Sequence, residues 1–356
     1  METNIRRRST VQSSGQVVYP PLDMRVVTVN PITPEPRAIE EAAAVLRRGG
    51  LVAFPTETVY GLGANALDAN AVAGIFAAKG RPSFNPLIVH VPDEAGARAL
   101  VREWPEHASV LARRFWPGPL TLVLHKLAIV PDIVTAGIDS VALRVPSHPI
   151  ALALLRASRL PLAAPSANRS MALSPTTARH VEKSLGDRVD IILDGGPTAV
   201  GIESTVIDLR GRRPLILRPG VIGVRELEPL VGPLGEPNEE SGESPRPAPG
   251  MLERHYAPLA RLVLFARAEA AGTLEEARSL TARGKEVAML VLGESAGAGR
   301  VVRMPREATR YAQRLYATLH ELDDAGCEVV FVERVPPESD WDGVRDRLER
   351  AAKSKS

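Results

Sequence analysis

Hydrophobic positions along the chain follow two periods, and together they predict an α/β protein. Short aliphatic and β-branched runs predict strands at 25–31, 51–58, 86–91, 120–126, 140–146, 161–168, 190–196, 204–209 and 214–220. Apolar residues at helical spacing predict helices at 36–50, 68–78, 107–115, 148–159 and 176–186, with Asp68 as an N-cap and a glycine-rich turn before it. Strands and helices are interleaved, but the last three strands follow one another closely. The pattern therefore favours a mixed sheet with flanking helices.

The same pattern divides the chain into four parts. We expect residues 1–24 to form a disordered N-terminal tail and residues 25–231 to form the first α/β domain. Proline, glycine and glutamate dominate residues 232–250, which cannot bury a core, so we assign 232–258 to a linker that ends in PGMLERHYAP. Strand patterns at 261–266, 286–293 and 328–335 alternate with helical patterns at 270–283, 307–325 and 342–353. They predict a second, smaller α/β domain over 259–350.

Composition narrows the class of protein. The 44 basic and 42 acidic residues give a net charge of +2, too balanced for a protein that mainly coats nucleic acid. Cys327 is the one cysteine, which excludes a disulfide within the chain and a cysteine-based zinc site, and we expect it to be structural. No run reaches the ~18 apolar residues of a membrane span, and the first residues lack the apolar segment of a secretory signal. We expect a cytoplasmic location.

The sequence contains no convincing match to the known nucleotide-binding and hydrolytic motifs. The chain has no GxxxxGK[ST] loop and no H-E-x-x-H, and it has no serine–histidine–aspartate order near a nucleophile elbow. The segment GLGANA (61–66) formally matches a dinucleotide fingerprint, but the helix does not open directly after it and no acid follows about 20 residues on. A dinucleotide site is therefore disfavoured.

Pairs of polar residues follow the ends of several apolar strands. Residues i and i+2 of a strand share a face, so Thr56 and Thr58 should point one way and Glu57 the other. Ser166 pairs with Asn168 in the same manner, and Lys79 would pair with Arg81 in KGRPSFNPLIVH if that turn is extended. Each pair alone is typical of a solvated strand end. Their joint occurrence favours a ligand site at the carboxyl edge of the sheet.

The residue types predict binding of phosphates. Lys79 and Arg81, together with Arg144 and Arg218 at strand ends, supply positive charge, and we expect Lys79 and Arg81 to be cleft charges that contribute little to folding. Neutral hydroxyls accompany them at Thr58, Ser140, Ser166, Ser174 and Ser204. No pair of carboxylates is placed for acid–base work. The set is typical of positioning and charge neutralisation, as in phosphoryl or nucleotidyl transfer.

Seven segments, in this order, carry a resemblance to a known family: FPTETVYGLG, KGRPSFNPLIVH, ALRVPSHP, APSAN, STVIDL, LRPG and PGMLERHYAP. The chain resembles the threonylcarbamoyl-AMP synthase family over about residues 25–350. The resemblance is to the long form, in which a YrdC-like mixed twisted sheet with flanking helices is followed by a smaller Rossmann-like domain. Glu253 in LERHYAP departs from the neutral residue we expect there, and Ser140 stands where some members have threonine.

The resemblance implies a nucleotidyltransferase that forms threonylcarbamoyl-AMP and pyrophosphate from L-threonine, bicarbonate or CO₂, and ATP. It implies L-threonine contacts at Thr58, His90, Arg144, Ala164 and Ser204. It implies ATP contacts at Arg81, Asn85, Ser140, Ser166, Ser174, Arg218 and Tyr256. Lys79, Arg81, Ser166 and Asn168 match the family's catalytic K-x-R and S-x-N signature. Mg²⁺ is expected on the ATP phosphates with few or no protein ligands, and the linker is expected to cover the site as a lid.

The implied partner is the tRNA threonylcarbamoyl transferase complex, which uses the adenylate to modify the adenosine beside the anticodon. Two alternatives stay open at this point. One is a non-catalytic module that binds tRNA or double-stranded RNA; a weak tRNA contact is also open for the synthase itself. The other is a carbamoyl-transfer enzyme, although such proteins carry zinc-finger cysteines that this chain lacks. The sequence leaves open the oligomeric state, the carbon donor, direct tRNA binding and the role of the second domain beyond anchoring the linker.

Overall fold

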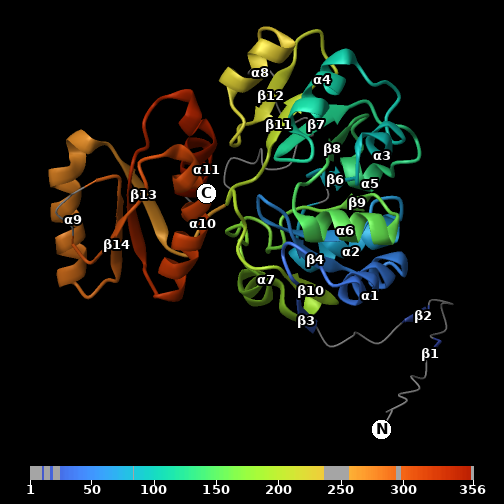
Figure 1. The fold of residues 1–356 in the computed structure, drawn as a ribbon. Coiled ribbons are helices and arrows are strands. Elements are labelled where there is room, and N and C mark those ends of the chain that lie inside the picture. The colour runs from blue at the N-terminus through green and yellow to red at the C-terminus, as the bar shows by residue number, and fades with distance from the viewer. Residues whose placement is uncertain are drawn as a thin grey trace.

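The computed structural model describes residues 25–82, 84–235, 256–293 and 298–353, together with a short antiparallel backbone pair, β1 (Thr10–Val11) and β2 (Val17–Val18). Apart from that pair, the predicted tail at 1–24 lies outside the described residues, as does the part of the predicted linker at 236–255. The described chain forms two α/β bodies side by side, a larger one up to residue 235 and a smaller one from residue 256 (Figure 1).

The larger body is built on a 10-stranded sheet in the order β12-β11-β7-β8-β6-β9-β5-β4-β10-β3. Its strands are β3 (Arg25–Thr28), β4 (Val52–Pro55), β5 (Tyr60–Asn65), β6 (Ile88–His90), β7 (Leu120–Leu124), β8 (Val141–Arg144), β9 (Leu162–Ala163), β10 (Ile191–Asp194), β11 (Thr205–Asp208) and β12 (Leu215–Arg218). β10 is parallel to β3 and β4, and β11 to β7, whereas β5 is antiparallel to both of its neighbours. The predicted mixed sheet is confirmed.

Helices cover the two faces of this sheet and divide its core in two. On one face α1 (Pro36–Arg47) and α6 (Pro149–Ser158) pack against β4, β9 and β10. The other face is covered by α2 (Ala69–Lys79), α4 (Glu106–Phe115) and α7 (Ala178–Leu185). Shorter helices connect these elements: α3 (Glu94–Arg98), α5 (Asp132–Thr135), the single turn Gly186–Arg188, and α8 (Val224–Val231). As predicted, Asp68 caps α2, accepting from the backbone N–H groups of Asn70 and Ala71.

Two local predictions about this body are wrong. The glycine-rich segment expected as a turn is strand β5, and packing requires the glycine at position 63, since a Cβ at Gly63 would lie 2.7 Å from Cε1 of Phe54. Lys79 is the last residue of α2 rather than part of an extended turn. Gly80 ends that helix in the left-handed conformation, with φ 59°.

The smaller body has a parallel sheet in the order β13-β16-β14-β15. Its elements are β13 (Arg261–Phe265), α9 (Ala270–Ala282), β14 (Val287–Val291), β15 (Arg300–Arg303), α10 (Ala308–Asp324), β16 (Val329–Glu333) and α11 (Asp342–Ala352), with short turns at Arg267–Glu269 and Ser339–Trp341. Figure 1 shows α10 and α11 on the side that faces the larger body and α9 on the far side. Cys327 is buried in this domain's core.

The two bodies share one hydrophobic cluster. Val59, Leu173 and Ile202 of the larger body pack in it with Tyr311, Leu315 and Tyr316 of α10 and with Val344 and Leu348 of α11. Tyr256, the first described residue of the smaller body, is buried in the same cluster. The smaller domain is therefore packed against the larger sheet through a continuous apolar core. Across the described residues, no helix is both long and apolar enough to cross a membrane.

Candidate functional site

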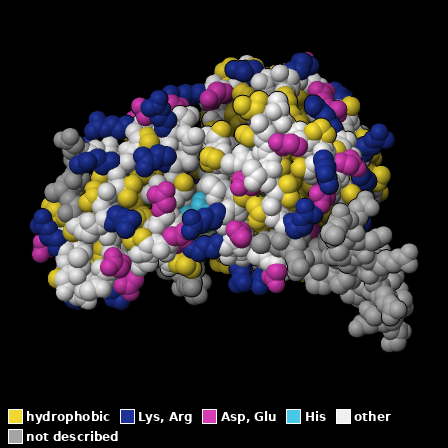
Figure 2. All heavy atoms as spheres, turned by 60° about the horizontal axis from the view of Figure 1, so that its bottom comes forward, with side chains coloured by type: hydrophobic (Ala, Val, Ile, Leu, Met, Phe, Trp, Pro, Cys, Tyr) yellow, Lys and Arg dark blue, Asp and Glu magenta, His cyan; other side chains and the backbone are white. Residues whose placement is uncertain are grey.

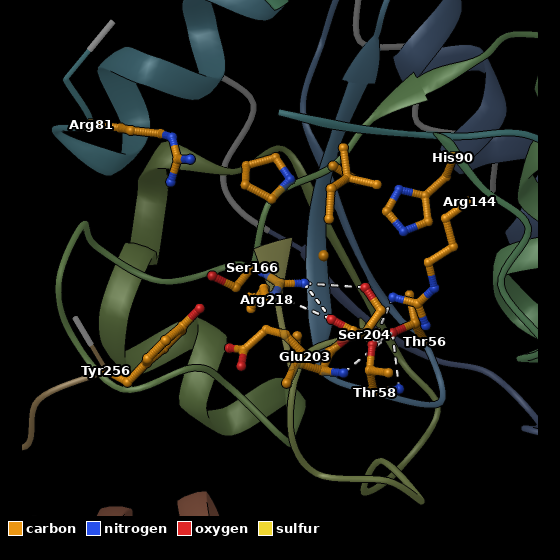
Figure 3. Close-up of a pocket in the computed structure, with 15 residues that line it drawn as sticks. Thr56, Thr58, Arg81, His90, Arg144, Ser166, Glu203, Ser204, Arg218 and Tyr256 are labelled. Carbon is orange, nitrogen blue, oxygen red and sulfur yellow. Dashed lines mark hydrogen bonds between the residues drawn. The ribbon is translucent and has the colours of Figure 1, made fainter. Parts of the chain in front are cut away.

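A pocket opens beside β5 and β6, at the ends of β8 and β12. It is lined by Thr56, Thr58, Val59, Gly61, Arg81, Ile88, His90, Arg144, Ala164, Pro165, Ser166, Glu203, Ser204, Arg218 and Tyr256. His90, Arg144 and Thr58 lie on one side of it, and Arg81, Ser166 and Tyr256 lie on the other (Figure 3). Ser204 and Arg218 lie between these two groups, so the pocket has two chemically different ends.

The first end is organised around Arg144, the last residue of β8. Its Nη2 donates to Glu57 Oε1 at 2.6 Å and its Nη1 to Thr58 Oγ1 at 2.9 Å, while Nε donates to the carbonyl of Gly118 at 3.2 Å. Glu57 also accepts from the backbone N–H of Ser147 at 3.1 Å. A guanidinium has five N–H donors. These three bonds therefore fix Arg144 and leave two donors for a ligand.

Glu57 contradicts the expected orientation of this segment. Residues 56–59 form a turn between β4 and β5, so the alternation of a strand does not apply to them. The hydroxyls of Thr56 and Thr58 do lie together, 2.8 Å apart, because the turn is closed by Thr56 Oγ1 donating to the carbonyl of Val59 at 2.7 Å. Glu57 and Thr58 both reach Arg144, and the sequence argument missed Glu57.

His90 lines the same end, with both ring nitrogens buried and without a hydrogen-bond partner among the described residues. Its ring meets Phe54 edge-on, with 6.4 Å between centroids. Burial, and then the charge of Arg144, lower the pKa of His90 to about 3. The imidazole is therefore neutral at physiological pH. A buried polar group without a partner is costly, which favours a ligand that hydrogen bonds to it.

At the other end, Arg81 is buried, with 8% of its surface exposed, and so is not the exposed cleft charge that we expected. Its Nε donates to the carbonyl of Asn85 at 3.2 Å and its Nη2 to that of Pro86 at 2.9 Å. Burial lowers the pKa of Arg81 to about 10, which leaves the guanidinium charged at neutral pH. Asn85 is buried too, and its Nδ2 has no partner among the described residues. Arg81 thus supports the backbone at Asn85 and Pro86 as well as lining the pocket.

Lys79 holds the segment that carries Ser166 and Asn168. Its Nζ donates to the carbonyl of Ser166 at 2.6 Å and to the carbonyl of Asn168 at 2.5 Å. Burial, and then the charge of Arg81, lower the pKa of Lys79 well below its usual value. Asn168 Nδ2 donates to the carbonyl of Ala172 at 2.8 Å. Of the signature residues, Arg81 and Ser166 line the pocket, while Lys79 and Asn168 support it from behind.

Ser204 and Arg218 join the two ends. Arg218, the last residue of β12, donates through Nη2 to the carbonyl of Ser204 at 2.9 Å and to its Oγ at 3.1 Å. The Ser204 hydroxyl lies 2.8 Å from Thr121 Oγ1 on the neighbouring strand. Burial is the main cause that lowers the pKa of Arg218. These contacts place a second buried guanidinium between the two ends, close enough to Arg81 for its charge to lower the pKa of Arg81.

The smaller domain reaches this site through Glu203, which the sequence argument also missed. Glu203 accepts hydrogen bonds from the Ser174 hydroxyl, from Tyr316 OH at 3.1 Å and from Arg347 Nε at 2.9 Å. A charged residue between Ile202 and an apolar strand was a signal that could have found Glu203. Arg347 gave no such signal, because the helix RDRLER contains other arginines that are more exposed.

The structure brings together nine of the fourteen residues predicted for the site. The nine that line the pocket are Thr58, Arg81, His90, Arg144, Ala164, Ser166, Ser204, Arg218 and Tyr256. The remaining five, none of them among its lining residues, are Lys79, Asn85, Ser140, Ser174 and Asn168. Ser140 lies at the opposite end of β8 from Arg144. It precedes β8, whereas Arg144 ends it, and four residues of strand span roughly 13 Å.

Two family models match the chain in succession. One, described as "Telomere recombination", matches residues 44–220, and the other, described as "Threonylcarbamoyl-AMP synthase, C-terminal domain", matches residues 222–353. The chain is 44% identical over 319 residues to a threonylcarbamoyl-AMP synthase of Pyrococcus abyssi, which covers 88% of this chain and 94% of the relative. It is 43% identical over 325 residues to the protein of the same name from Bacillus subtilis, covering 88% and 92%.

A solved structure matches both bodies at once. The crystal structure of Pyrococcus abyssi Sua5 complexed with L-threonine superposes with a TM-score of 0.86 at 43% identity. The match covers 92% of this chain and 97% of that one. The similarity therefore extends over the mixed sheet, the parallel sheet and their relative placement.

Proposed function

This chain belongs to the threonylcarbamoyl-AMP synthase family, and from that premise we propose how its pocket forms threonylcarbamoyl-AMP and pyrophosphate from L-threonine, bicarbonate or CO₂, and ATP. One observation carries the assignment of the two ends. Guanidinium groups lie at both ends of the pocket. The buried carboxylates of Glu57 and Glu203 already form ion pairs with Arg144 and Arg347, respectively. The pocket therefore suits two ligands that carry negative charge.

The end that contains Arg144 is proposed to bind L-threonine. The two remaining donors of Arg144 would bind the carboxylate of the amino acid. Neutral His90 can hydrogen bond to the threonine hydroxyl or amine without repelling the ammonium form, and Thr58 and Ser204 add neutral contacts. Ala164, on the wall of the pocket, is too small to block this space and completes the proposed set.

The other end is proposed to bind ATP. Arg81 and Arg218 would offset the charge of the phosphates, while Ser166 and Tyr256 would contact the nucleotide. Asn85, with its unpartnered Nδ2, fits the same role behind Arg81. Ser140 and Ser174 stay predictions as ATP contacts. We propose that the signature residues Lys79 and Asn168 act indirectly, by positioning the segment that carries Ser166, to which Lys79 donates hydrogen bonds.

The proposed chemistry begins with the neutral amine of threonine. The amine adds to CO₂, forming an N–C bond and releasing a proton, and the product is a carbamate. A carbamate oxygen then attacks the α-phosphorus of ATP, and the bond from that phosphorus to the β-bridging oxygen breaks as pyrophosphate leaves. The chain contributes position and charge neutralisation in this scheme. Because both the carbamate and the adenylate are attacked by water, burial of Tyr256 over the pocket would protect them.

The residues that line the pocket do not fit a protein-held Mg²⁺ ion. Glu203, the carboxylate among its described lining residues, and Glu57 behind Arg144 already accept hydrogen bonds through both oxygens. Nor does any group of three histidine, cysteine, aspartate or glutamate side chains within the described part of the chain form a metal-binding cluster. We propose that Mg²⁺ enters on the phosphates of ATP, which is the manner in which it is often held.

We propose further that the adenylate passes to a tRNA threonylcarbamoyl transferase complex in the cytoplasm. The RNA-binding alternative has less support, because on the face shown in Figure 2 basic side chains are spread over both domains with acidic ones among them. Incubating the protein with ATP, labelled bicarbonate and L-threonine should yield labelled threonylcarbamoyl-AMP by mass detection, and leaving out any one substrate should abolish it. Salt-dependent tRNA binding without pyrophosphate release would instead favour the RNA-binding module.

A further inference from the structure

One arginine of the smaller domain reaches into the backbone that carries the proposed ATP site. Arg347 lies in α11, and its side chain has no exposed surface. Its Nε donates to Glu203 Oε2 at 2.9 Å, its Nη2 to the carbonyl of Glu203 at 3.2 Å and its Nη1 to the carbonyl of Pro219 at 2.6 Å. Three of its acceptors thus belong to the larger domain.

The two positions that Arg347 holds flank two pocket residues. Glu203 immediately precedes Ser204, and Pro219 immediately follows Arg218. Ser204 and Arg218 are themselves joined by the hydrogen bonds from Arg218 to the Ser204 carbonyl and hydroxyl. Arg347 therefore fixes, from outside the pocket, the start of β11 relative to the end of β12.

The same guanidinium also lies against the aromatic group that lines the pocket. Its Cζ is 5.2 Å from the centroid of the Tyr256 ring, and that ring lies 6.0 Å from the ring of Tyr316. Tyr316 in turn donates to Glu203 Oε2 at 3.1 Å. Tyr256 adopts a φ of 61°, which is unusual for a tyrosine, so its position depends on such neighbours.

Charge explains why this contact is more than a tether between domains. Burial alone would raise the pKa of Glu203, but the charges of Arg347 and then Arg218 outweigh it and lower that pKa. Glu203 Oε1 accepts from the Ser174 hydroxyl, so the ionised carboxylate also orients Ser174. A fully buried ion pair is a poor source of stability compared with apolar packing. Its bonds instead specify one arrangement of the backbone, which is what a binding site requires.

We propose that Arg347 is a positioning residue of the synthase reaction, supplied by the smaller domain. Through Glu203, Pro219 and Tyr256 it holds Ser174 and Arg218, both proposed ATP contacts, in the arrangement that accepts ATP. The inference rests on the proposed function, and it gives the second domain a part in ATP binding beyond anchoring the linker. Loss of Arg347 should then affect ATP more than L-threonine, because Arg144, Thr58 and His90 are held by contacts that do not involve the smaller domain.

The test measures KM for ATP and for L-threonine, by pyrophosphate release, in the intact chain. We expect Arg347→Met to raise the KM for ATP by roughly tenfold or more, with less than a twofold change in the KM for L-threonine. Arg347→Lys keeps the charge but loses the forked geometry, so it should recover part of the loss. Arg345→Met is the matched control, since Arg345 lies in the same helix and its hydrogen bonds to described residues go to Asp342, Pro336 and Glu338 of its own domain.

Tyr316→Phe guards against a failure of Arg347→Met to fold, because it removes only the hydroxyl that donates to Glu203. It should raise the KM for ATP by about two- to fivefold. If every folded variant keeps the wild-type KM for ATP and differs only in melting temperature, Arg347 is an interdomain contact and the inference is wrong. A wild-type protein that releases no pyrophosphate contradicts the proposed function instead. In that case direct ATP titration of the same variants still decides the role of Arg347.

Discussion

Arg144 and Glu57 form a buried ion pair, with 2.6 Å between Nη2 and Oε1, at the end of the pocket proposed to bind L-threonine. The pair explains how a guanidinium can be buried in the site before a ligand binds. Glu57 balances its charge and fixes one nitrogen, and Arg144 still lines the pocket with two donors that make none of these bonds. A substrate carboxylate would then bind beside a neutralised pair rather than beside an isolated charge.

We predict that the stability and the threonine-binding roles of this pair can be separated. Arg144→Met should destabilise the fold by about 3–5 kcal/mol, because Glu57 is left as a buried charge without its partner. The double variant Glu57→Gln, Arg144→Met should regain much of the lost melting temperature, since the uncompensated charge is gone. It should still bind L-threonine about 10–100-fold more weakly by calorimetry. Wild-type threonine affinity in the double variant would show that Arg144 does not hold the carboxylate.

A second prediction compares Lys79 with Arg81. Lys79→Met should lower melting temperature and turnover together, because the carbonyls of Ser166 and Asn168 lose their shared donor. Arg81→Lys keeps a positive charge at the pocket but cannot reach the carbonyls of Asn85 and Pro86 in the same way. It should reduce turnover by about tenfold or more with a smaller loss of stability. Wild-type turnover in the Arg81→Lys protein would contradict the proposed contact between Arg81 and the phosphates.

The domain interface also contains a pair of stacked histidines. His180 of α7 and His320 of α10 lie with ring centroids 3.8 Å apart and planes 19° from parallel. His320 Nε2 lies 3.1 Å from the carbonyl of Ser174. Around the stack are the charged groups Arg179, Lys183, Asp323 and Asp324, and Lys183 forms an ion pair with Asp324. Two imidazolium ions could not stack in this way without strong repulsion.

Stability should therefore fall on mild acidification. Burial, and then His320, lower the pKa of His180 to about 4, and burial also lowers the pKa of His320. Since the folded state binds protons less readily than the unfolded state, the contribution is complete above pH ~6.5 and is lost as the pH falls towards 4. His180→Asn should flatten the fall of melting temperature across that window. His90 is present in both proteins, so its titration does not contribute to the difference between their pH curves. Parallel curves for the two proteins would contradict a role for the stack.

The sequence predicted the large-scale organisation because it depends on hydrophobic periodicity. Most predicted strands and helices of both domains are present within a few residues, and Asp68 caps its helix as expected. β5 was missed because its pattern is broken by Gly61 and Gly63, which lie where Phe54 and Ala164 approach the backbone. These neighbours are distant in the sequence or on the next strand, so the local pattern could not show that the two glycines belong to a strand.

The site was predicted through a family resemblance, and its supporting contacts were not. Lys79 and Arg81 looked like exposed cations, yet both are buried and donate to backbone carbonyls. Glu57 and Arg347 pair with residues 87 and 144 positions away, respectively. Partners at such separations leave no local pattern in a single sequence. Tertiary packing alone decides which arginine of a charged helix is buried.

The last prediction concerns Tyr256 and the lid, whose residues 236–255 lie outside the described chain. Truncation after Val231 would remove the linker together with the smaller domain, but the shared core argues against that test. Removing the smaller domain would expose Val59, Leu173 and Ile202 and leave Glu203 without Arg347. A defect in such a protein would report misfolding of the interface as readily as loss of a lid. Point substitutions at Tyr256 in the full-length chain avoid this problem.

We expect Tyr256→Ala to weaken ATP binding and to lose adenylate to water. The ring is buried between the pocket and the residues Arg347 and Tyr316, so its removal opens that side of the site. Loss of the aromatic contact should raise the KM for ATP by about two- to tenfold, and the amount of intact adenylate per pyrophosphate released should fall. Tyr256→Phe keeps the ring and should retain that ratio. Because deletion of a buried aromatic costs ~3–5 kcal/mol, both variants must be assayed well below their melting temperatures. An unchanged ratio and an unchanged KM for ATP in Tyr256→Ala would mean that this end of the linker serves only to tether the second domain.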